Sequence, residues 1–330
     1  MQHGLALHRI EGRQEGGFGW HRYPDCTRRP AMLRAVHPTG ELSPARTDPT
    51  TVAERYLELL KRSLTKVDSS TERIRDHVPI RRLNRAALRL LGPFLRRRRL
   101  RLVRTYRLDP RIYEIGFGGQ PDAISMIGLR RMENIQQLAA DVLRRGVPGD
   151  FIETGVWRGG ATIFMRGILE AYGDTERRVW VADSFEGLPK PDLERYPADE
   201  HVWMLKDGEW LDQLAVSLEE VKANFERYGL LDDRVRFLVG WFKDTLPSAP
   251  IDRISLLRLD GDLYASTIQA LDALYPKVSD GGYVIVDDYG SWEPCFKAVN
   301  DYRATHGIED EIVWIDWTGA YWQKRSGPAA

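Results

Sequence analysis

The sequence predicts an α/β fold in which a parallel sheet is covered on both faces by helices. From residue 122 onward, short runs that are apolar throughout alternate with amphipathic segments of helical period. Strands without a polar face are typical of a parallel sheet that is buried on both sides. Such a sheet binds its ligand at the carboxyl ends of its strands, near the point where the strand order reverses. We therefore expect the functional residues at those strand ends.

The predicted elements follow one another in a regular order. A helix is expected over residues 124–145, ended by Gly146 and Pro148. Strands are expected at residues 151–156, 179–183, 235–239, 254–260, 283–287 and 312–315. Helices are expected between them at residues 161–171, 218–228, 267–275 and 296–305. This succession assigns residues 122–330 to one α/β domain.

The first 121 residues depart from this pattern. Residues 1–50 mix Gly, Pro, Arg and His without apolar periodicity, and we expect a flexible arm. Apolar residues at helical spacing follow, with Thr50 or Thr51 as the cap, and predict an amphipathic helix. Residues 73–107 are rich in Arg, which indicates either a contact surface for an anionic partner or, as we prefer, a solvated helix broken at Gly92-Pro93. Residues 51–121 are thus expected to form a helical, Arg-rich amino-terminal region.

Composition narrows the choice of partner and compartment. Lys+Arg and Asp+Glu both number 48, so the overall charge does not favour nucleic acid or acidic lipid. Cys26 and Cys295 form no CxxC pair, which argues against a disulfide framework. No apolar run approaches the roughly 18 residues that a spanning helix needs, and the first 51 residues lack the apolar core of a signal peptide. We expect a cytoplasmic protein that acts on a small molecule, without nucleic-acid or membrane partners.

A glycine-rich turn follows the first predicted strand. The run Glu153-Thr154-Gly155-Val156-Trp157-Arg158-Gly159-Gly160 leads directly into a helix. Glycines at such a turn permit close approach of a ligand to the backbone, although turns of this kind also occur for structural reasons alone. Asp183 ends the second strand, where a carboxylate either accepts hydrogen bonds from ribose hydroxyls or caps the next turn. Together these features favour a nucleotide-type ligand.

The strongest functional signal is a set of aspartates at two later strand ends. One strand runs into Asp260-Gly261-Asp262 and the other into Asp287-Asp288. If the two strands are parallel and adjacent, these carboxylates converge, and like charges at that distance need a cation. Oxygen ligands without His or Cys in the motif suit Mg²⁺ or Mn²⁺. The alternative is that Asp262 and Asp288 only cap turns and helices.

A cation beside a bound cosubstrate indicates group transfer to a hydroxyl. Coordination of two oxygens of a vicinal diol orients the acceptor and lowers the pKa of its hydroxyl, so that a carboxylate removes the proton as attack begins. Asp260 is the first choice for a ligand that also acts as the base, and Asp262 is the alternative base. The sequence does not separate the two.

Six segments in order resemble the macrocin O-methyltransferase family of the TylF/MycF type. They are residues 125–128 (SMIG), 147–150 (VPGD), 153–160 (ETGVWRGG), 183–189 (DSFEGLP), 257–267 (LRLDGDLYAST) and 281–290 (GGYVIVDDYG). The resemblance covers residues 55–61 and nearly all of residues 123–324. It implies a Rossmann-like class I methyltransferase fold with a mostly parallel seven-stranded sheet, the cosubstrate S-adenosylmethionine, Mg²⁺, and a deoxysugar hydroxyl of a bacterial natural product as acceptor. It also implies homo-oligomers in which amino-terminal elements help to close a neighbouring site.

The resemblance assigns roles to individual residues. The cofactor contacts that it implies are Glu153, Thr154, Gly155 and Gly159 around the methionine part, Asp183 and Ser184 at the ribose, and Gly240, Trp241 and Phe242 at the adenine. The implied metal ligands are Asp260, Asp287 and Asp288, of which Asp260 also borders the cofactor. Residues 190–214, with Tyr196, His201, Trp203 and Trp210, form either a lid over the acceptor or an ordinary surface loop.

Two other classes of function fit part of the pattern. The glycine loop and the acid of the second strand also fit an NAD-dependent oxidoreductase, but hydride transfer needs no Mg²⁺ site at the acidic cluster. A methyltransferase fold that serves as a non-catalytic binding partner, with the Arg-rich stretch as its contact surface, is the second alternative. Retention of the acidic positions argues against it.

Overall fold

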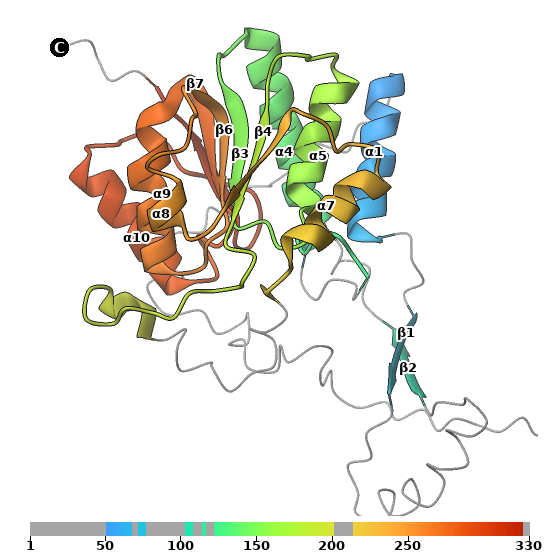
Figure 1. Ribbon diagram of the computed structural model, residues 1–330, viewed down its shortest axis with the longest axis horizontal. Helices are drawn as coiled ribbons and strands as arrows, with labels where there is room; N and C mark the ends of the chain where they lie inside the picture. The colour runs from blue at the N-terminus through green and yellow to red at the C-terminus, as the bar shows by residue number, and fades with distance from the viewer. Residues whose placement is uncertain are drawn as a thin grey trace, which may run out of the picture.

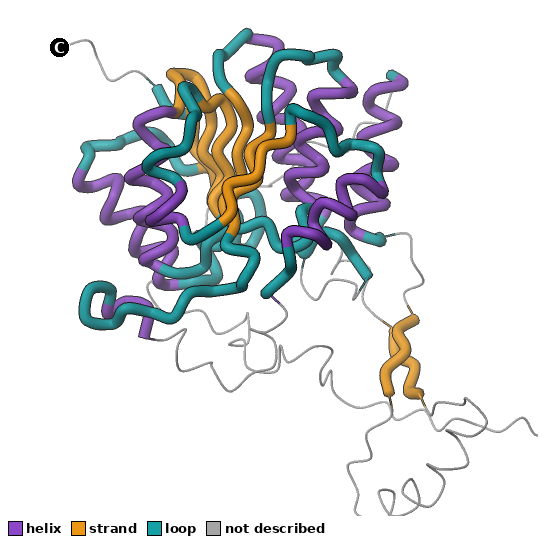
Figure 2. Tube along the Cα trace, in the orientation of Figure 1, coloured by secondary structure: helices purple, strands orange, loops and turns teal. Residues whose placement is uncertain are grey.

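The computed structural model describes residues 51–67, 72–76, 103–107, 114–116, 122–200 and 214–325. In this part of the chain a seven-stranded sheet lies between two layers of helices (Figures 1 and 2). The strands are β3 (Asp150–Thr154), β4 (Val179–Asp183), β5 (Val235–Val239), β6 (Ile254–Leu259), β7 (Val278–Val286), β8 (Val313–Trp314) and β9 (Ala320–Gln323). The predicted α/β fold with a mostly parallel seven-stranded sheet is confirmed.

The order of the strands, β5-β4-β3-β6-β7-β9-β8, places a reversal of the chain path between β3 and β6. Strands β3 to β7 pair in parallel, whereas β9 is antiparallel to both of its neighbours. The amide of Asp260 donates to the carbonyl of Thr154 at 2.9 Å, and the amide of Asp287 donates to the carbonyl of Leu259 at 2.9 Å. The carboxyl ends of β3, β6 and β7 are therefore fixed side by side.

Helices cover both faces because the strands are apolar on both. One face carries α1 (Val52–Thr65), α4 (Leu129–Arg145), α5 (Gly160–Ala171) and α7 (Leu218–Arg227), and the other carries α8 (Phe242–Thr245), α9 (Tyr264–Leu274) and α10 (Glu293–Thr305) (Figure 1). Successive strand residues enter opposite cores: Phe151 packs with the first layer and Ile152 with the second. The short 3-10 helices η3 (Pro197–Asp199) and η5 (Tyr275–Lys277) lie in the connections.

Helix α1 confirms the amphipathic helix predicted before the Arg-rich stretch. Thr51 forms a capping box with Glu54, which satisfies backbone donors at the start of the helix. Its buried face packs against α5, where a Cβ at Gly167 would lie 2.4 Å from a methyl carbon of Leu60. The helix is thus an integral layer of the domain.

The helical prediction is wrong at both ends of the Arg-rich stretch. Strand β1 (Glu72–Asp76) pairs antiparallel with β2 (Val103–Arg107). Residues such as Ile74, Val103 and Thr105 favour strands because their branched side chains fit an extended backbone better than a helix. Residues 77–102, with Gly92-Pro93, and residues 1–50 lie outside the described residues, so the expected arm and the boundaries of this region stay predictions.

Two details of the main domain differ from expectation. Helix α4 begins at Leu129 because Gly128, in an extended conformation, precedes it as the N-cap. Strand β9 has no counterpart among the predicted strands, since only four residues form it after a short turn. No helix in the described ranges is long and apolar enough to cross a bilayer.

Candidate functional site

A cavity of about 470 Å³ opens at the carboxyl ends of the parallel strands. Its size lies within the range of about 300–1,000 Å³ that is usual for small-molecule sites. Of the residues predicted to carry function, those lining it are Gly155, Asp183, Ser184, Trp241, Phe242, Asp260 and Asp262. Glu153, Thr154, Gly159, Gly240, Asp287 and Asp288 are not among its lining residues. The cavity lies at the strand reversal, where the fold class predicts a ligand.

The turn from β3 to α5 brings the backbone of two strand ends into contact. Gly155 has a φ of +82°, and a Cβ at this position would lie 1.7 Å from the carbonyl oxygen of Asp260. Gly159, with a φ of +84°, is the N-cap of α5. Only glycine accommodates both the conformation and the close approach at Gly155. Glycine at this position therefore lets the ends of β3 and β6 pack directly against each other at the wall of the cavity.

Asp183 connects the ends of β4 and β3. One carboxylate oxygen accepts a hydrogen bond from the amide of Val156 at 2.7 Å, and the other accepts from the amide of Phe185 at 2.7 Å. Burial raises the pKa of this carboxyl, and the backbone donors act against the rise. The backbone of Trp157 and the side chain of Ser184 also donate toward this carboxylate. Asp183 thus both shapes the turn and faces the cavity.

Two aromatic residues follow β5 on the same wall. The amide of Gly240 donates to the carbonyl of Asp183 at 2.9 Å, which fixes the position of the next residues. Trp241 is the N-cap of α8 and Phe242 its first residue, and both are half-buried at the cavity. Flat apolar faces at this place suit a planar ring system.

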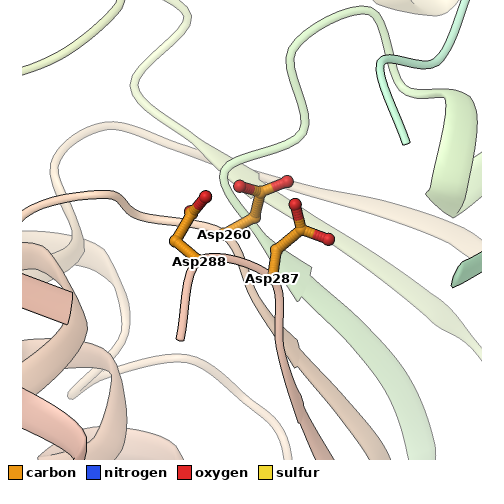
Figure 3. Close-up of side chains that lie close together, drawn as sticks. All are labelled: Asp260, Asp287 and Asp288. Carbon is orange, nitrogen blue, oxygen red and sulfur yellow. The ribbon is translucent and has the colours of Figure 1, made fainter. Parts of the chain in front are cut away.

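The aspartates at the ends of β6 and β7 converge as the sequence predicted. Asp260, Asp287 and Asp288 point toward one another (Figure 3), and one carboxylate oxygen from each lies within 4.8 Å of the others. The convergence follows from the parallel pairing of β6 with β7. Asp262 comes two residues after Asp260 and lines the cavity.

Two buried arginines share this cluster, and the sequence analysis did not identify either. Arg258 forms ion pairs with Glu153 and Asp287, and with Asp260 at 2.8 Å. Arg131 pairs with the second oxygen of Asp287 and, at 3.1 Å, with Asp316. A charged residue inside the apolar strand β6 was a usable signal for Arg258. Arg131 gave no such signal, because it stands in a helix with many other charges.

Carboxyl groups outnumber the arginines in this cluster. The charges of Glu153, Asp260, Asp287, Asp288 and Asp316 act on the two guanidinium groups, and Asp262 interacts with Asp260 and Asp287. Burial, together with the charges of neighbouring carboxylates, raises the pKa of Asp262 to about 8 and that of Asp288 well above its ordinary value. Burial likewise raises the pKa of Glu153 to about 8. The clustered carboxyls therefore ionise less readily than free ones, and a cation bound among them would favour their ionised forms.

The residues fit a hard divalent cation. All donors are oxygens, the class of ligand that Mg²⁺ and Mn²⁺ prefer. Asp288 contributes a buried oxygen, Oδ2, that has no hydrogen-bond partner in the described structure. Both oxygens of Asp287 already accept from arginine, yet a carboxylate oxygen has room for a second partner.

The two candidates for the base differ in their surroundings. Burial, and then the charge of Asp287, raise the pKa of Asp260, and its ion pair with Arg258 counteracts the rise. Asp262 has a φ of 55°, a conformation rare for residues other than glycine, which places it at the cavity. Its pKa is governed by burial and then by the charges of Asp260 and Asp287, not by a hydrogen-bond donor in the described residues. Both aspartates line the cavity, and in the described residues Asp262 is the one without an arginine partner.

Part of the suspected lid forms one wall of the cavity. Leu188, Pro189, Lys190, Pro191, Asp192, Arg195 and Tyr196 line it from the loop after β4, together with Leu214. His201, Trp203 and Trp210 lie outside the described residues. The described portion of the loop is therefore a wall of the site.

The open sheet with its strand-end cavity, glycine turn and acidic edge defines a class I methyltransferase fold. The family model for macrocin O-methyltransferase (TylF) matches residues 53–324, and the chain belongs to this family. The resemblance noted in the sequence is therefore confirmed. The chain is an O-methyltransferase, which removes the oxidoreductase alternative.

Relatives agree with this assignment. The chain is 53% identical over 221 residues to 8-demethyl-8-(2,3-dimethoxy-alpha-L-rhamnosyl)-tetracenomycin-C 4'-O-methyltransferase of Streptomyces olivaceus, covering 67% of this chain and 82% of the relative. It is 56% identical over 203 residues to demethyldecarbamoylnovobiocin O-methyltransferase of Streptomyces niveus, covering 62% and 76%. The solved structure of the O-methyltransferase NovP has 44% sequence identity and a TM-score of 0.70, and the match covers 83% of this chain and 100% of NovP.

Proposed function

We propose that this enzyme transfers a methyl group from S-adenosylmethionine to a sugar hydroxyl of a glycosylated natural product, with Mg²⁺ or Mn²⁺ at the acidic cluster. The observation that carries the proposal is the convergence of Asp260, Asp287 and Asp288 beside a cavity that the glycine turn and Asp262 also line. The name of the Streptomyces olivaceus relative gives a rhamnosyl group in its substrate, which supports a sugar acceptor.

The cofactor end of the cavity is built from β3, β4 and the turn after β5. The methionine part lies along the turn of Gly155 and Gly159, whose glycines let the turn pack tightly against β6 and α7, with Glu153 and Thr154 behind them. Asp183 accepts hydrogen bonds from the ribose hydroxyls, with Ser184 beside it, while Trp241 and Phe242 flank the adenine after Gly240. S-adenosylmethionine, when bound, supplies a methyl group on a sulfonium for in-line displacement, leaving neutral S-adenosylhomocysteine.

The acceptor end is built from the acidic cluster. Asp260, Asp287 and Asp288 would hold the cation, whose positive charge would lower the pKa of an acceptor hydroxyl bound to it. Asp262 takes the proton of the acceptor hydroxyl as the new carbon–oxygen bond forms. Arg258 and Arg131 keep the ligands oriented from behind. The residues thus act mainly by proximity, orientation and charge.

Ligand-dependent melting tests the cofactor assignment. We expect S-adenosylhomocysteine to raise the melting temperature, because a ligand at 100 times its Kd stabilises the folded state by about 2.7 kcal/mol. NAD, which lacks the amino acid part, is the matched control and should give no shift. Stabilisation by NAD alone would contradict the proposal, and no response to either nucleotide favours the non-catalytic alternative. Turnover is then tested by mass spectrometry with a panel of glycosides of the kinds that the relatives methylate.

Removal of metal tests the role of the acidic cluster. We expect excess EDTA to abolish methyl transfer and added Mg²⁺ or Mn²⁺ to restore it. Asp288→Asn should weaken Mn²⁺ binding, followed by electron paramagnetic resonance, on the order of 10–100-fold. Asp272→Asn, an exposed position on α9, is the control and should bind Mn²⁺ like the wild type. Full activity in excess EDTA would refute the metal role. Homo-oligomers and a cytoplasmic location stay predictions.

A further inference from the structure

A carboxylate from the loop after β4 caps the start of α9. Asp199 is fully buried, and its two oxygens accept hydrogen bonds from the amides of Tyr264 at 2.6 Å and Ala265 at 3.1 Å. These are the first two residues of an eleven-residue helix. The N-cap of that helix is Leu263, whose side chain makes no capping hydrogen bond. Asp199, 65 positions away in sequence, therefore supplies the capping hydrogen bonds that a local Ser, Thr or Asp ordinarily makes.

On one side of this contact lies the loop that carries Asp262. Gly261, Asp262 and Leu263 directly precede the capped amides, and Asp262 has the left-handed φ of 55° described above. A residue in that conformation persists only where its surroundings hold it. The capped amides of Tyr264 and Ala265 hold it from the helix side.

On the other side lies the loop wall of the cavity. This wall is held together internally: the amide of Tyr196 donates to the carbonyl of Asp192 at 2.7 Å, and the amide of Asp199 donates to the carbonyl of Tyr196 at 3.1 Å. The ring of Tyr196 also lies 5.9 Å from that of Tyr264. The buried carboxylate of Asp199 therefore links the loop wall to the segment that carries Asp262.

The cofactor end is held by different contacts. Asp183 is fixed by the amides of Val156 and Phe185, and Gly155 is fixed against Asp260. Burial raises the pKa of Asp199, and the two backbone donors on α9 counteract the rise. A carboxylate buried in this way stays ionised only while its hydrogen-bond donors remain in place.

We propose that Asp199 is a positioning residue for methyl transfer: it fastens the loop wall to the loop bearing Asp262 and so shapes the acceptor end without affecting the cofactor end. This rests on the proposed function. Losing the carboxylate leaves two buried amides unpaired, so the wall and the base lose their common anchor.

The test compares Asp199→Ala and Asp199→Asn with Ser217→Ala. Ser217 caps α7 through the amide of Glu220 at 3.2 Å and is a matched loss of a helix cap away from this contact. Hydrogen exchange is followed by mass spectrometry, and the Kd of S-adenosylhomocysteine by calorimetry. We expect Asp199→Ala to speed exchange at residues 188–200 and 262–266 by about tenfold or more, with β3 and β6 unchanged. The asparagine variant keeps one acceptor oxygen and should lie in between.

The affinity for S-adenosylhomocysteine should stay within about twofold of wild type in all three variants, because the cofactor contacts are separate. With a panel glycoside that gives turnover, KM for the glycoside should rise about tenfold in Asp199→Ala and not in Ser217→Ala. Unchanged exchange at residues 188–200, faster exchange throughout the sheet, or an equal loss of S-adenosylhomocysteine affinity would each overturn the proposal. Absence of turnover by the wild type would instead contradict the proposed function, and the exchange and calorimetric results would still decide the role of Asp199.

Discussion

Asp262→Asn is expected to lower the rate of methyl transfer by about 10²–10⁴-fold, the usual contribution of a general base. The substitution keeps the size of the side chain, and Asn tolerates the left-handed φ of 55° at this position. The fold and the cofactor end should therefore be preserved, with S-adenosylhomocysteine affinity within about threefold of wild type. Single-turnover kinetics with a methylated product detected by mass spectrometry measures the loss.

Asp252→Asn is the matched control for this experiment. Asp252 is exposed and lies just before β6, at the opposite end of the strand from the cavity. It should turn over like the wild type. A rate close to wild type for Asp262→Asn would show that another group takes the proton, and Asp260 would then be the remaining candidate. Asp260→Asn is less informative alone, because it also breaks the ion pair with Arg258.

Gly155→Ala is expected to abolish cofactor binding and to destabilise the domain by roughly 2–5 kcal/mol. Two costs add: a left-handed conformation at φ +82°, and a Cβ placed 1.7 Å from the carbonyl oxygen of Asp260. The clash is between backbone atoms of neighbouring strand ends, so no side chain can rotate away. Relief requires β3 and β6 to separate, which breaks the hydrogen bond from the Asp260 amide to Thr154. Calorimetry with S-adenosylhomocysteine and chemical denaturation measure the two effects.

Gly173→Ala is the control that measures the cost of the left-handed conformation without the steric clash of a Cβ. Gly173 has a φ of +69°, but a Cβ there would meet no atom within 4 Å. It should therefore lose only about 1–2 kcal/mol of stability and bind S-adenosylhomocysteine normally. Equal effects of the two substitutions would mean that the close approach at Gly155 has no energetic consequence, which would contradict this prediction.

Much of the fold could be predicted because the strands are largely apolar on both faces, as in residues 179–182, and helical segments separate them. The meeting of Asp260 with Asp287 and Asp288 followed from the same reasoning, since parallel neighbouring strands end at one edge. Their roles in binding metal stay predictions.

Contacts between distant segments could not be predicted. Arg131 reaches Asp287 from α4, and Asp199 reaches α9 from a loop, and neither contact has a local pattern. The strands at Glu72–Asp76 and Val103–Arg107 pair across a long intervening segment, so local helical propensity was a poor guide there. Sequence patterns report local conformation well and the partners of individual charged side chains poorly.

Arg258 couples the energetics of the cofactor end and the acceptor end of the proposed site. Because one guanidinium serves Glu153, Asp260 and Asp287, a change at any of these carboxylates alters the field that the others experience. Free energies measured for single substitutions in this group will not sum. Redesign of the acceptor preference is therefore best confined to the loop wall at residues 188–196, where side chains can be exchanged without disturbing that common counter-ion.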